Sequence, residues 1–118
     1  IMRAETASKW LIAPDSAWTA MQWMTITVQA TPELQAKCPA VVHVDNTLRP
    51  QLIHQEQHPT LWKILEKFET QTGLPALINT SFNRHEEPIV ATTHDALNAF
   101  WESKLDGLWL NDWWIEQK

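Results

Sequence analysis

The chain has 118 residues, of which 44% are hydrophobic and 19% are charged, and its formal net charge at pH 7 is -5. The acidic balance, with only nine scattered Lys and Arg residues, excludes the basic surface that binds a nucleic-acid backbone. No apolar run approaches the roughly 18 residues of a membrane-spanning helix, and the first residues lack the pattern of a secretion signal. We therefore expect one soluble, unexported globular domain over residues 1–118.

Cys38 is the only cysteine, which excludes an internal disulfide and a cysteine-rich zinc framework and favours a reducing cytoplasm. Cys38 and His43 offer a nucleophile and a base, but a small buried hydrophobic residue is the favoured interpretation of Cys38. His54 and His58 have the spacing of metal ligands on a helix. Because Pro59 places the helix start after both, no metal site is predicted.

The first part of the chain predicts short elements. Residues 3–11 are expected to form a short helix, and the alternating, β-branched pattern of residues 24–28 predicts a strand. The Thr-Pro-Glu sequence at residues 31–33 is typical of a helix or turn start. The apolar run at residues 39–44 predicts a second strand within a sheet, and residues 45–47 predict a turn.

The middle of the chain contains the clearest helix. After an extended segment at residues 49–54, Pro59 occupies a first helical turn and Gly73 marks the end. Apolar residues between them recur at the spacing of one helix face, namely Leu61, Ile64, Leu65 and Phe68. This helix is expected to pack on the sheet.

The last third alternates extended and helical segments. Residues 74–78 predict a short strand, and residues 79–83 a polar turn. Thr92 with Asp95 three residues later resembles a capping box. The buried face of the next helix should comprise Ala96, Leu97, Phe100 and Trp101, and a strand over residues 108–110 should follow. Because helices alternate with strands, the predicted class is α/β (α+β), with one mixed, twisted sheet flanked by helices.

Two polar clusters are candidates for binding a small anion. In the loop at residues 79–83, hydroxyls, amides and free backbone N–H donors follow a strand, as in phosphate-binding loops; taken alone, this cluster is more often a plain turn, which is the favoured interpretation. The second cluster runs from His43 to Arg49, whose forked guanidinium suits phosphate or carboxylate. A structural ion pair between Asp45 and Arg49 is the alternative there.

The eight tryptophans show no fixed period, so no repeat architecture is predicted. Trp109, Trp113 and Trp114 are expected to pack in the core or in an interface, with stacking on a sugar as the alternative. The adjacent carboxylates of Glu86 and Glu87 are expected to lie in a solvated loop, with a role as general bases as the alternative.

Two stretches of sequence point to a known family. Residues 39–51 read Pro-Ala-Val-Val-His-Val-Asp-Asn-Thr-Leu-Arg-Pro-Gln, and residues 77–83 read Leu-Ile-Asn-Thr-Ser-Phe-Asn, with Glu-Pro-Ile-Val following at residues 87–90. In this order and spacing they resemble the NodU and CmcH type carbamoyltransferases. The similarity covers nearly the whole chain, including residues 95–97 and 105–108.

The resemblance implies a fold and a reaction. In that family a C-terminal YrdC-like α/β domain is joined to an N-terminal domain of the actin and sugar-kinase type. Residues 1–118 would then be the C-terminal part of a partial YrdC-like domain, with the rest of the parent upstream. The family implies that ATP, with Mg²⁺, and carbamoyl phosphate form carbamoyl-adenylate there. The carbamoyl group would then pass to an acceptor hydroxyl, often on a sugar or antibiotic, at the N-terminal domain.

The resemblance also implies roles for particular residues. Arg49 would hold the phosphates and neutralise charge as phosphate or pyrophosphate leaves, and Thr80 and Ser81 would donate to phosphoryl or carbamoyl oxygens. Arg49 and Ser81 are thus the expected catalytic residues. Further candidates for touching the ligand or shaping its loop are His43, Asp45, Asn79 and Asn83.

The chain departs from the family pattern in ways that matter. Asn46 and Glu86 stand where glycine is usual; Asn adopts the left-handed conformation readily, whereas Glu does so at a cost. A basic, proline-containing segment with phosphate-binding Lys and Arg is expected upstream of Ile1, so the isolated chain is expected to be inactive. Uncovered apolar surface would favour its self-association. A non-catalytic ligand- or carbohydrate-binding module is the alternative.

Overall fold

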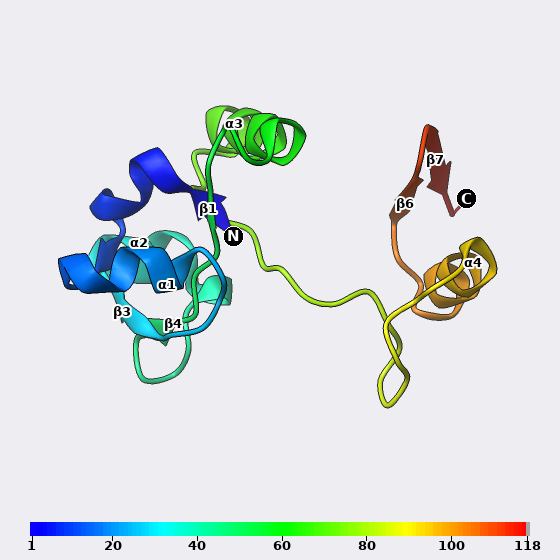
Figure 1. The fold of residues 1–118 in the computed structure, drawn as a ribbon, viewed down its shortest axis with the longest axis horizontal. Helices are drawn as coiled ribbons and strands as arrows, with labels where there is room; N and C mark the ends of the chain where they lie inside the picture. Colours follow the sequence, from blue (N-terminus) through cyan, green and yellow to red (C-terminus); the bar gives the residue numbers. More distant parts are fainter. Residues whose placement is uncertain (118) are drawn as a thin grey trace. The chain divides into compact units, whose positions relative to one another are not determined.

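The computed structural model describes residues 1–117, which divide into two compact units, Ile1–Asn79 and a second that begins at Thr80 (Figure 1). Each unit contains helices and strands, which confirms the predicted α+β class. No helix in residues 1–117 combines the length and apolar character needed to cross a membrane. That the two units act as one domain stays a prediction.

The larger unit contains two small sheets instead of one. Strand β1 (Met2–Arg3) pairs in parallel with β5 (Leu52–Ile53). Strand β3 (Val28–Ala30) lies between β2 (Leu11–Ile12) and β4 (Thr47–Leu48), antiparallel to both. These strands are only two or three residues long, too short to extend into the single mixed sheet predicted from the sequence, so that part of the prediction is wrong.

Helices α2 (Pro32–Lys37) and α3 (Pro59–Thr72) begin where the sequence predicts, whereas the helix predicted over residues 3–11 is only the 3-10 helix η1 (Ala4–Lys9), with the strands β1 and β2 on either side. Helix α2 is capped by Thr31, whose hydroxyl accepts a hydrogen bond from the Leu34 backbone N–H at 3.3 Å. Helix α3 ends at Gly73, whose φ of 74° is left-handed. The remaining helical segments are η2 (Asp15–Ala17), α1 (Trp18–Met21) and η3 (Pro39–Val41).

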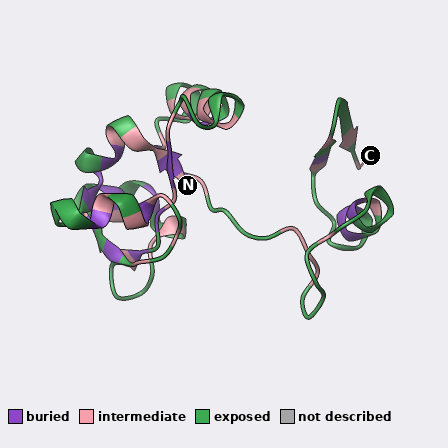
Figure 2. Ribbon diagram, in the orientation of Figure 1, coloured by how far each residue is buried: buried purple, intermediate pink, exposed green. Residues whose placement is uncertain are grey.

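One continuous core holds the larger unit together (Figure 2). Its buried members are Met2, Ala7, Trp10, Leu11, Met21, Val28, Ala30, Leu34, Cys38, Leu48, Leu52 and Ala76. Cys38 is one of them, as expected of a small hydrophobic residue, and burial raises the pKa of its thiol. The core therefore contains side chains from both ends of the unit, from Met2 in β1 to Ala76 in the segment after α3.

Three of the predicted strands are replaced by other backbone. Residues 39–44 form η3 and a turn, because Pro39 continues directly from the end of α2 as a first 3-10 residue. The strand predicted at residues 24–28 begins only at Val28, since Met24 has a left-handed φ of 56°. Residues 74–78 contribute a single bridge between Ala76 and Met2. An apolar run alone did not distinguish these segments from strands.

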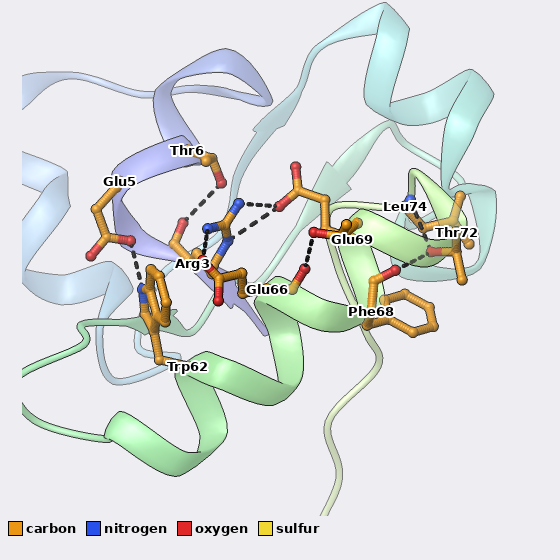
Figure 3. Close-up of polar contacts among 10 residues, drawn as sticks. Arg3, Glu5, Thr6, Trp62, Glu66, Phe68, Glu69, Thr72 and Leu74 are labelled. Atoms are coloured by element: carbon orange, nitrogen blue, oxygen red, sulfur yellow. Dashed lines mark hydrogen bonds and ion pairs between the residues drawn. The ribbon is translucent and has the colours of Figure 1, made fainter.

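The N-terminal segment fixes α3 through a polar cluster around Arg3 (Figure 3). The Arg3 guanidinium donates to Glu69 Oε2 through Nη2 at 2.7 Å and Nε at 3.2 Å. It also lies 5.2 Å from the ring centroid of Trp62, a cation–π geometry. Trp62 Nε1 donates to Glu5 at 2.9 Å. These contacts tie α3 to the segment around β1 and η1.

The smaller unit consists of one helix and one hairpin. Helix α4 (Thr93–Glu102) begins with the predicted capping box of Thr92 and Asp95, which is confirmed. Strands β6 (Gly107–Leu110) and β7 (Trp113–Glu116) pair antiparallel, and β7 was not predicted. The buried residues of this unit are Ala96, Ala99, Phe100 and Leu108. Trp101 was predicted to be buried, but it is 51% exposed.

Candidate functional site

A cleft of about 190 Å³ lies in the larger unit and contains three of the predicted site residues. The side chains of His43, Arg49 and Asn79 are its polar lining. The rest of the lining is mainly apolar and comprises Ile1, Met2, Met24, Ala40, Val41, Leu48, Pro50, Ala76, Leu77 and Ile78. A few polar groups in an apolar concavity are the usual composition of a small-ligand site.

Arg49 directly follows strand β4 and lines this cleft. Leu48 and Pro50, on either side of Arg49 in the sequence, are buried, whereas Arg49 is exposed, in keeping with the alternation of an extended chain. The guanidinium makes no hydrogen bond or ion pair with residues 1–117. The Asp45–Arg49 ion pair that was the alternative interpretation is not formed. The donors of Arg49 therefore remain available to an anion.

A turn before β4 orients His43. Asp45 accepts hydrogen bonds from the Thr47 hydroxyl at 2.7 Å and the Thr47 backbone N–H at 3.0 Å, and these bonds lower the pKa of the Asp45 carboxyl. Thr47 Oγ1 also lies 3.1 Å from His43 Nδ1. Because the Thr47 hydroxyl proton is directed to Asp45, Oγ1 acts as acceptor for Nδ1–H. Neutral His43 thus keeps the lone pair on Nε2.

Asn79 is held by residues far away in the sequence. Its Nδ2 donates to Gln51 Oε1 at 2.6 Å and lies 3.9 Å from Met24 Sδ. Gln51 is itself fixed, since its backbone carbonyl accepts from the Met2 backbone N–H at 3.1 Å. The side-chain amide of Asn79 is therefore oriented at the cleft and does not swing freely in solvent.

The predicted loop of the smaller unit is braced by its own side chains. Ser81 Oγ donates to Asn83 Oδ1 at 2.5 Å, and Asn83 Nδ2 donates to the backbone carbonyls of Arg84 at 2.9 Å and Glu87 at 3.1 Å. Thr80 and Ser81 are exposed. The structure thus brings His43, Arg49 and Asn79 together in one unit and Thr80, Ser81 and Asn83 together in the other. That Arg49 and Ser81 bind one reactant stays a prediction.

Comparison with known proteins identifies the family. The profile described as "Carbamoyltransferase C-terminus" matches residues 1–117. The chain belongs to this family. This confirms the resemblance on which the predicted site residues rest.

Several relatives are similar to this carbamoyltransferase C-terminal chain. Nodulation protein NolO of Bradyrhizobium diazoefficiens is 36% identical over 104 residues, which are 88% of the chain and 19% of that protein. Nodulation protein NolNO of Sinorhizobium fredii is 33% identical over 114 residues, or 97% of the chain and 17% of that protein. An uncharacterized Methanocaldococcus jannaschii protein, MJ1058, is 34% identical over 95 residues, or 80% and 16%. The chain spans less than a fifth of each relative.

The two departures from the family's glycine pattern have the backbone that glycine would favour. Asn46 and Glu86 both have φ of 65°, in the left-handed region. Asn46 lies in the turn that contains the Asp45–Thr47 hydrogen bonds. Glu86 adopts the same left-handed conformation despite the larger penalty that its side chain carries there.

Arg84 is a charged residue of the smaller unit that sequence reasoning did not select. Its guanidinium forms ion pairs with Glu87 and Glu102, and the hydrogen bond from Arg84 lowers the pKa of the Glu87 carboxyl. These pairs neutralise Arg84 and hold the loop to α4. Glu87 is therefore a structural partner of Arg84, which argues against a free general base at that position.

Three residues that shape the site were missed from the sequence: Met24, Thr47 and Gln51. Each acts on a site residue through its side chain, and Met24 and Gln51 do so across many residues of sequence. Thr47 alone carried a local signal, since Asp-x-Thr is a common hydrogen-bonded turn. No group of three or more His, Cys, Asp or Glu side chains within residues 1–117 is arranged to hold a metal ion.

Proposed function

We propose that this chain forms the anion-binding part of an ATP-dependent O-carbamoyltransferase, as a section of a longer polypeptide. The observation that supports the proposal is the unpaired Arg49 guanidinium in a small, mainly apolar cleft of a carbamoyltransferase family member. A guanidinium whose forked donors have no partner can bind a phosphate group through two parallel hydrogen bonds.

The proposed reaction has three steps: hydrolysis of carbamoyl phosphate, adenylation of the carbamate and transfer of the carbamoyl group. Water cleaves carbamoyl phosphate to phosphate and carbamate, and a carbamate oxygen then attacks the α-phosphorus of ATP. Pyrophosphate leaves, and carbamoyl-adenylate forms. The acceptor hydroxyl, on a sugar or an antibiotic-like molecule, attacks the carbamoyl carbon; AMP leaves with the bridging oxygen, and the hydroxyl proton passes to a base.

Each predicted residue has a place in this reaction. Arg49 would neutralise the charge on phosphate or pyrophosphate as it leaves, and Asn79 lines the same cleft. His43 offers the Nε2 lone pair, and Asp45 fixes the tautomer through Thr47. The loop residues Thr80, Ser81 and Asn83 would supply hydroxyl and amide donors to phosphoryl or carbamoyl oxygens.

The size and lining of the cleft decide what it would hold. At about 190 Å³ it is smaller than the roughly 300–1,000 Å³ of sites that enclose drug-sized ligands. It therefore suits carbamoyl phosphate or the phosphates of ATP, and the rest of the nucleotide would lie on other parts of the parent. No carboxylate lines the cleft within residues 1–117, so Mg²⁺ would be held through the ATP phosphates.

The rest of the parent supplies what this chain lacks. We propose that an N-terminal domain of the actin and sugar-kinase type receives the carbamoyl group and binds the acceptor. The isolated chain would be inactive, would self-associate through uncovered apolar surface, and in the cell would be cytoplasmic.

The test is carbamoyl phosphate-dependent release of pyrophosphate from ATP by the full-length parent. Arg49→Ala should lower kcat/KM for carbamoyl phosphate by about 100-fold or more, as for loss of a charge-stabilising donor. Arg49→Lys keeps the charge but loses the fork and should fall between the two. Lys67→Ala, on the exposed face of α3, is the matched control and should retain the wild-type rate. A wild-type rate for Arg49→Ala would refute the proposal.

A second candidate function is a carbohydrate-binding module, and the tryptophans of the smaller unit favour it. Trp101, Trp109, Trp113 and Trp114 are each more than half exposed, and flat exposed indoles can stack on sugar rings. Titration of the chain with sugars, followed by Trp fluorescence, tests this candidate. Saturable sugar binding that survives Arg49→Ala and Ser81→Ala, with no effect of nucleotide, would favour it over the carbamoyltransferase.

A further inference from the structure

The hydrogen bonds of Asn79 leave one particular atom for a ligand. An amide nitrogen carries two hydrogens. In Asn79 this nitrogen donates to Gln51 Oε1 at 2.6 Å and lies 3.9 Å from the sulfur of Met24, a weak acceptor. Within residues 1–117 the Asn79 carbonyl oxygen, Oδ1, accepts no side-chain hydrogen bond. The polar atom of Asn79 that remains at the cleft is therefore an acceptor.

An acceptor at this position does not suit a phosphate oxygen. Ionised phosphate offers lone pairs, and two acceptors that face each other repel. An N–H group of the ligand would instead satisfy Oδ1. Arg49 in the same cleft presents only donors, so the two side chains are complementary to a ligand that has an anionic end and an N–H end.

The two residues that contact the Asn79 amide, Gln51 and Met24, themselves have a defined backbone conformation. Gln51 is fixed by its main-chain hydrogen bond to Met2. Met24 is a non-glycine residue with a φ of 56°, a left-handed conformation that is unfavourable for an ordinary side chain. Strained residues of this kind cluster at ligand sites, where the surrounding structure holds them. Met24, Gln51 and Asn79 come from three distant segments and meet beside the cleft.

We propose that Asn79 is the specificity residue that recognises the amino group of the carbamoyl substrate. Its Oδ1 accepts from the carbamoyl N–H while Arg49 binds the phosphate, and Gln51 is a positioning residue that keeps the Asn79 amide from rotating. This inference rests on the proposed carbamoyltransferase function and deepens it. It predicts that the site prefers carbamoyl phosphate to acetyl phosphate, which has the same shape but a methyl group in place of the amino group.

The experiment compares these two ligands in the full-length parent. The KM for carbamoyl phosphate is measured by pyrophosphate release, and acetyl phosphate is titrated as a competitive inhibitor to give its KI. Asn79→Leu should raise the KM about tenfold or more, the usual effect of one lost polar contact, and leave the KI within about twofold. Gln51→Met should change the KM in the same direction by less. Asn98→Leu, an exposed asparagine of α4 outside the cleft, is the matched control.

The adenine of ATP also carries an amino group that could donate to Asn79 Oδ1. ITP lacks this amino group, so comparing ATP with ITP shows whether Asn79 binds the adenine or the carbamoyl amino group. The proposal expects the preference for ATP over ITP to be the same in wild type and Asn79→Leu. It is overturned if Asn79→Leu leaves the KM unchanged, if KM and KI rise together, or if the ATP preference is lost instead.

Failure of the proposed function would be visible separately. If the wild-type parent releases no pyrophosphate with carbamoyl phosphate, the carbamoyltransferase proposal fails. Calorimetric binding of carbamoyl phosphate and acetyl phosphate to wild type and Asn79→Leu then decides the role of Asn79 alone. A selective loss of carbamoyl phosphate affinity supports it, and equal affinities for the two ligands in wild type refute it.

Discussion

The two units of this chain position their polar residues in different ways. In the larger unit, a continuous core fixes β4 and the segment after α3, and the cleft residue Asn79 is held by Gln51, a partner distant in sequence. In the smaller unit few side chains are buried, and Ser81 and Asn83 are oriented by bonds within their own loop. A short chain buries too small a fraction of its surface to position a loop by packing, so local hydrogen bonds take over.

The largest expected effect concerns the two cores. Leu34→Ala in the larger unit and Phe100→Ala in the smaller unit both truncate fully buried side chains, at costs of about 2–5 and 3–5 kcal/mol of unfolding free energy. Because Phe100 is the largest buried side chain of a small core, its loss should unfold the smaller unit while the larger stays folded. Amide hydrogen exchange of α4 and α3 measures this. Exchange that rises equally in both helices would show that the units unfold together.

The helix caps allow a gentler comparison. Thr31→Ala and Thr92→Ala each remove a hydroxyl that accepts a backbone N–H at a helix start, which costs about 1 kcal/mol. With less packing behind it, α4 should lose more exchange protection than α2. Thr70→Ala, in the last turn of α3, is the control, since its hydroxyl donates to the Glu66 carbonyl and caps no helix start. Greater loss in α2 would mean that packing does not compensate for a lost cap.

The two left-handed residues Glu86 and Asn46 should differ in how much stability a glycine substitution adds. Glu86→Gly relieves a conformation that costs roughly 1–2 kcal/mol, less the entropy that glycine adds to the unfolded chain, so a net gain of up to about 1 kcal/mol is expected. Asn46→Gly should be nearly neutral, because Asn tolerates this conformation. Urea unfolding of both variants measures the difference. Destabilisation by Glu86→Gly would contradict the strain argument.

The smallest effects are on two carboxylates, one in each unit. Hydrogen bonds from Thr47 and Thr92 lower the pKa values of Asp45 and Asp95. Since a lowered folded pKa favours the ionised form, the contribution of each is present above the unfolded value of about 3.9 and is lost as pH falls through the folded pKa. Thr47→Val should raise the pKa of Asp45 and leave that of Asp95 in place, as followed by carboxyl NMR titration. If the pKa of Asp45 does not change in this variant, groups other than the Thr47 hydroxyl must lower it.

Local signals in the sequence were sufficient for α2, α3 and α4, but not for the short helical segments η1, η2 and α1. The proline and glycine limits of α3, the Thr31 cap of α2 and the capping box of α4 are each written in a few adjacent residues, and each is found in the structure. The strands were less predictable. Residues 39–44 are apolar enough for a strand, but a proline after α2 directs them into a 3-10 turn. Whether a segment forms a strand depends on a neighbouring strand with which it can pair, and adjacent residues in the sequence do not specify that neighbour.

The candidate site was predictable to the same extent. His43, Arg49 and Asn79 were selected from their chemistry and the family resemblance, and they line one cleft. Gln51 and Met24 were not selected, because nothing beside them in the sequence signals that they contact Asn79. Groups that orient a site through long-range contacts are defined by the fold and not by local pattern.

The burial of Cys38 gives the protein an internal probe. It is the chain's only thiol and belongs to the core of the larger unit, so a soluble alkylating reagent reaches it only when that unit opens. The raised pKa keeps the closed thiol protonated and slow to react. The alkylation rate of the unmodified protein therefore measures how often the unit of residues 1–79 opens. A ligand that binds in the cleft and stabilises this unit would slow the alkylation, and no engineered label is needed.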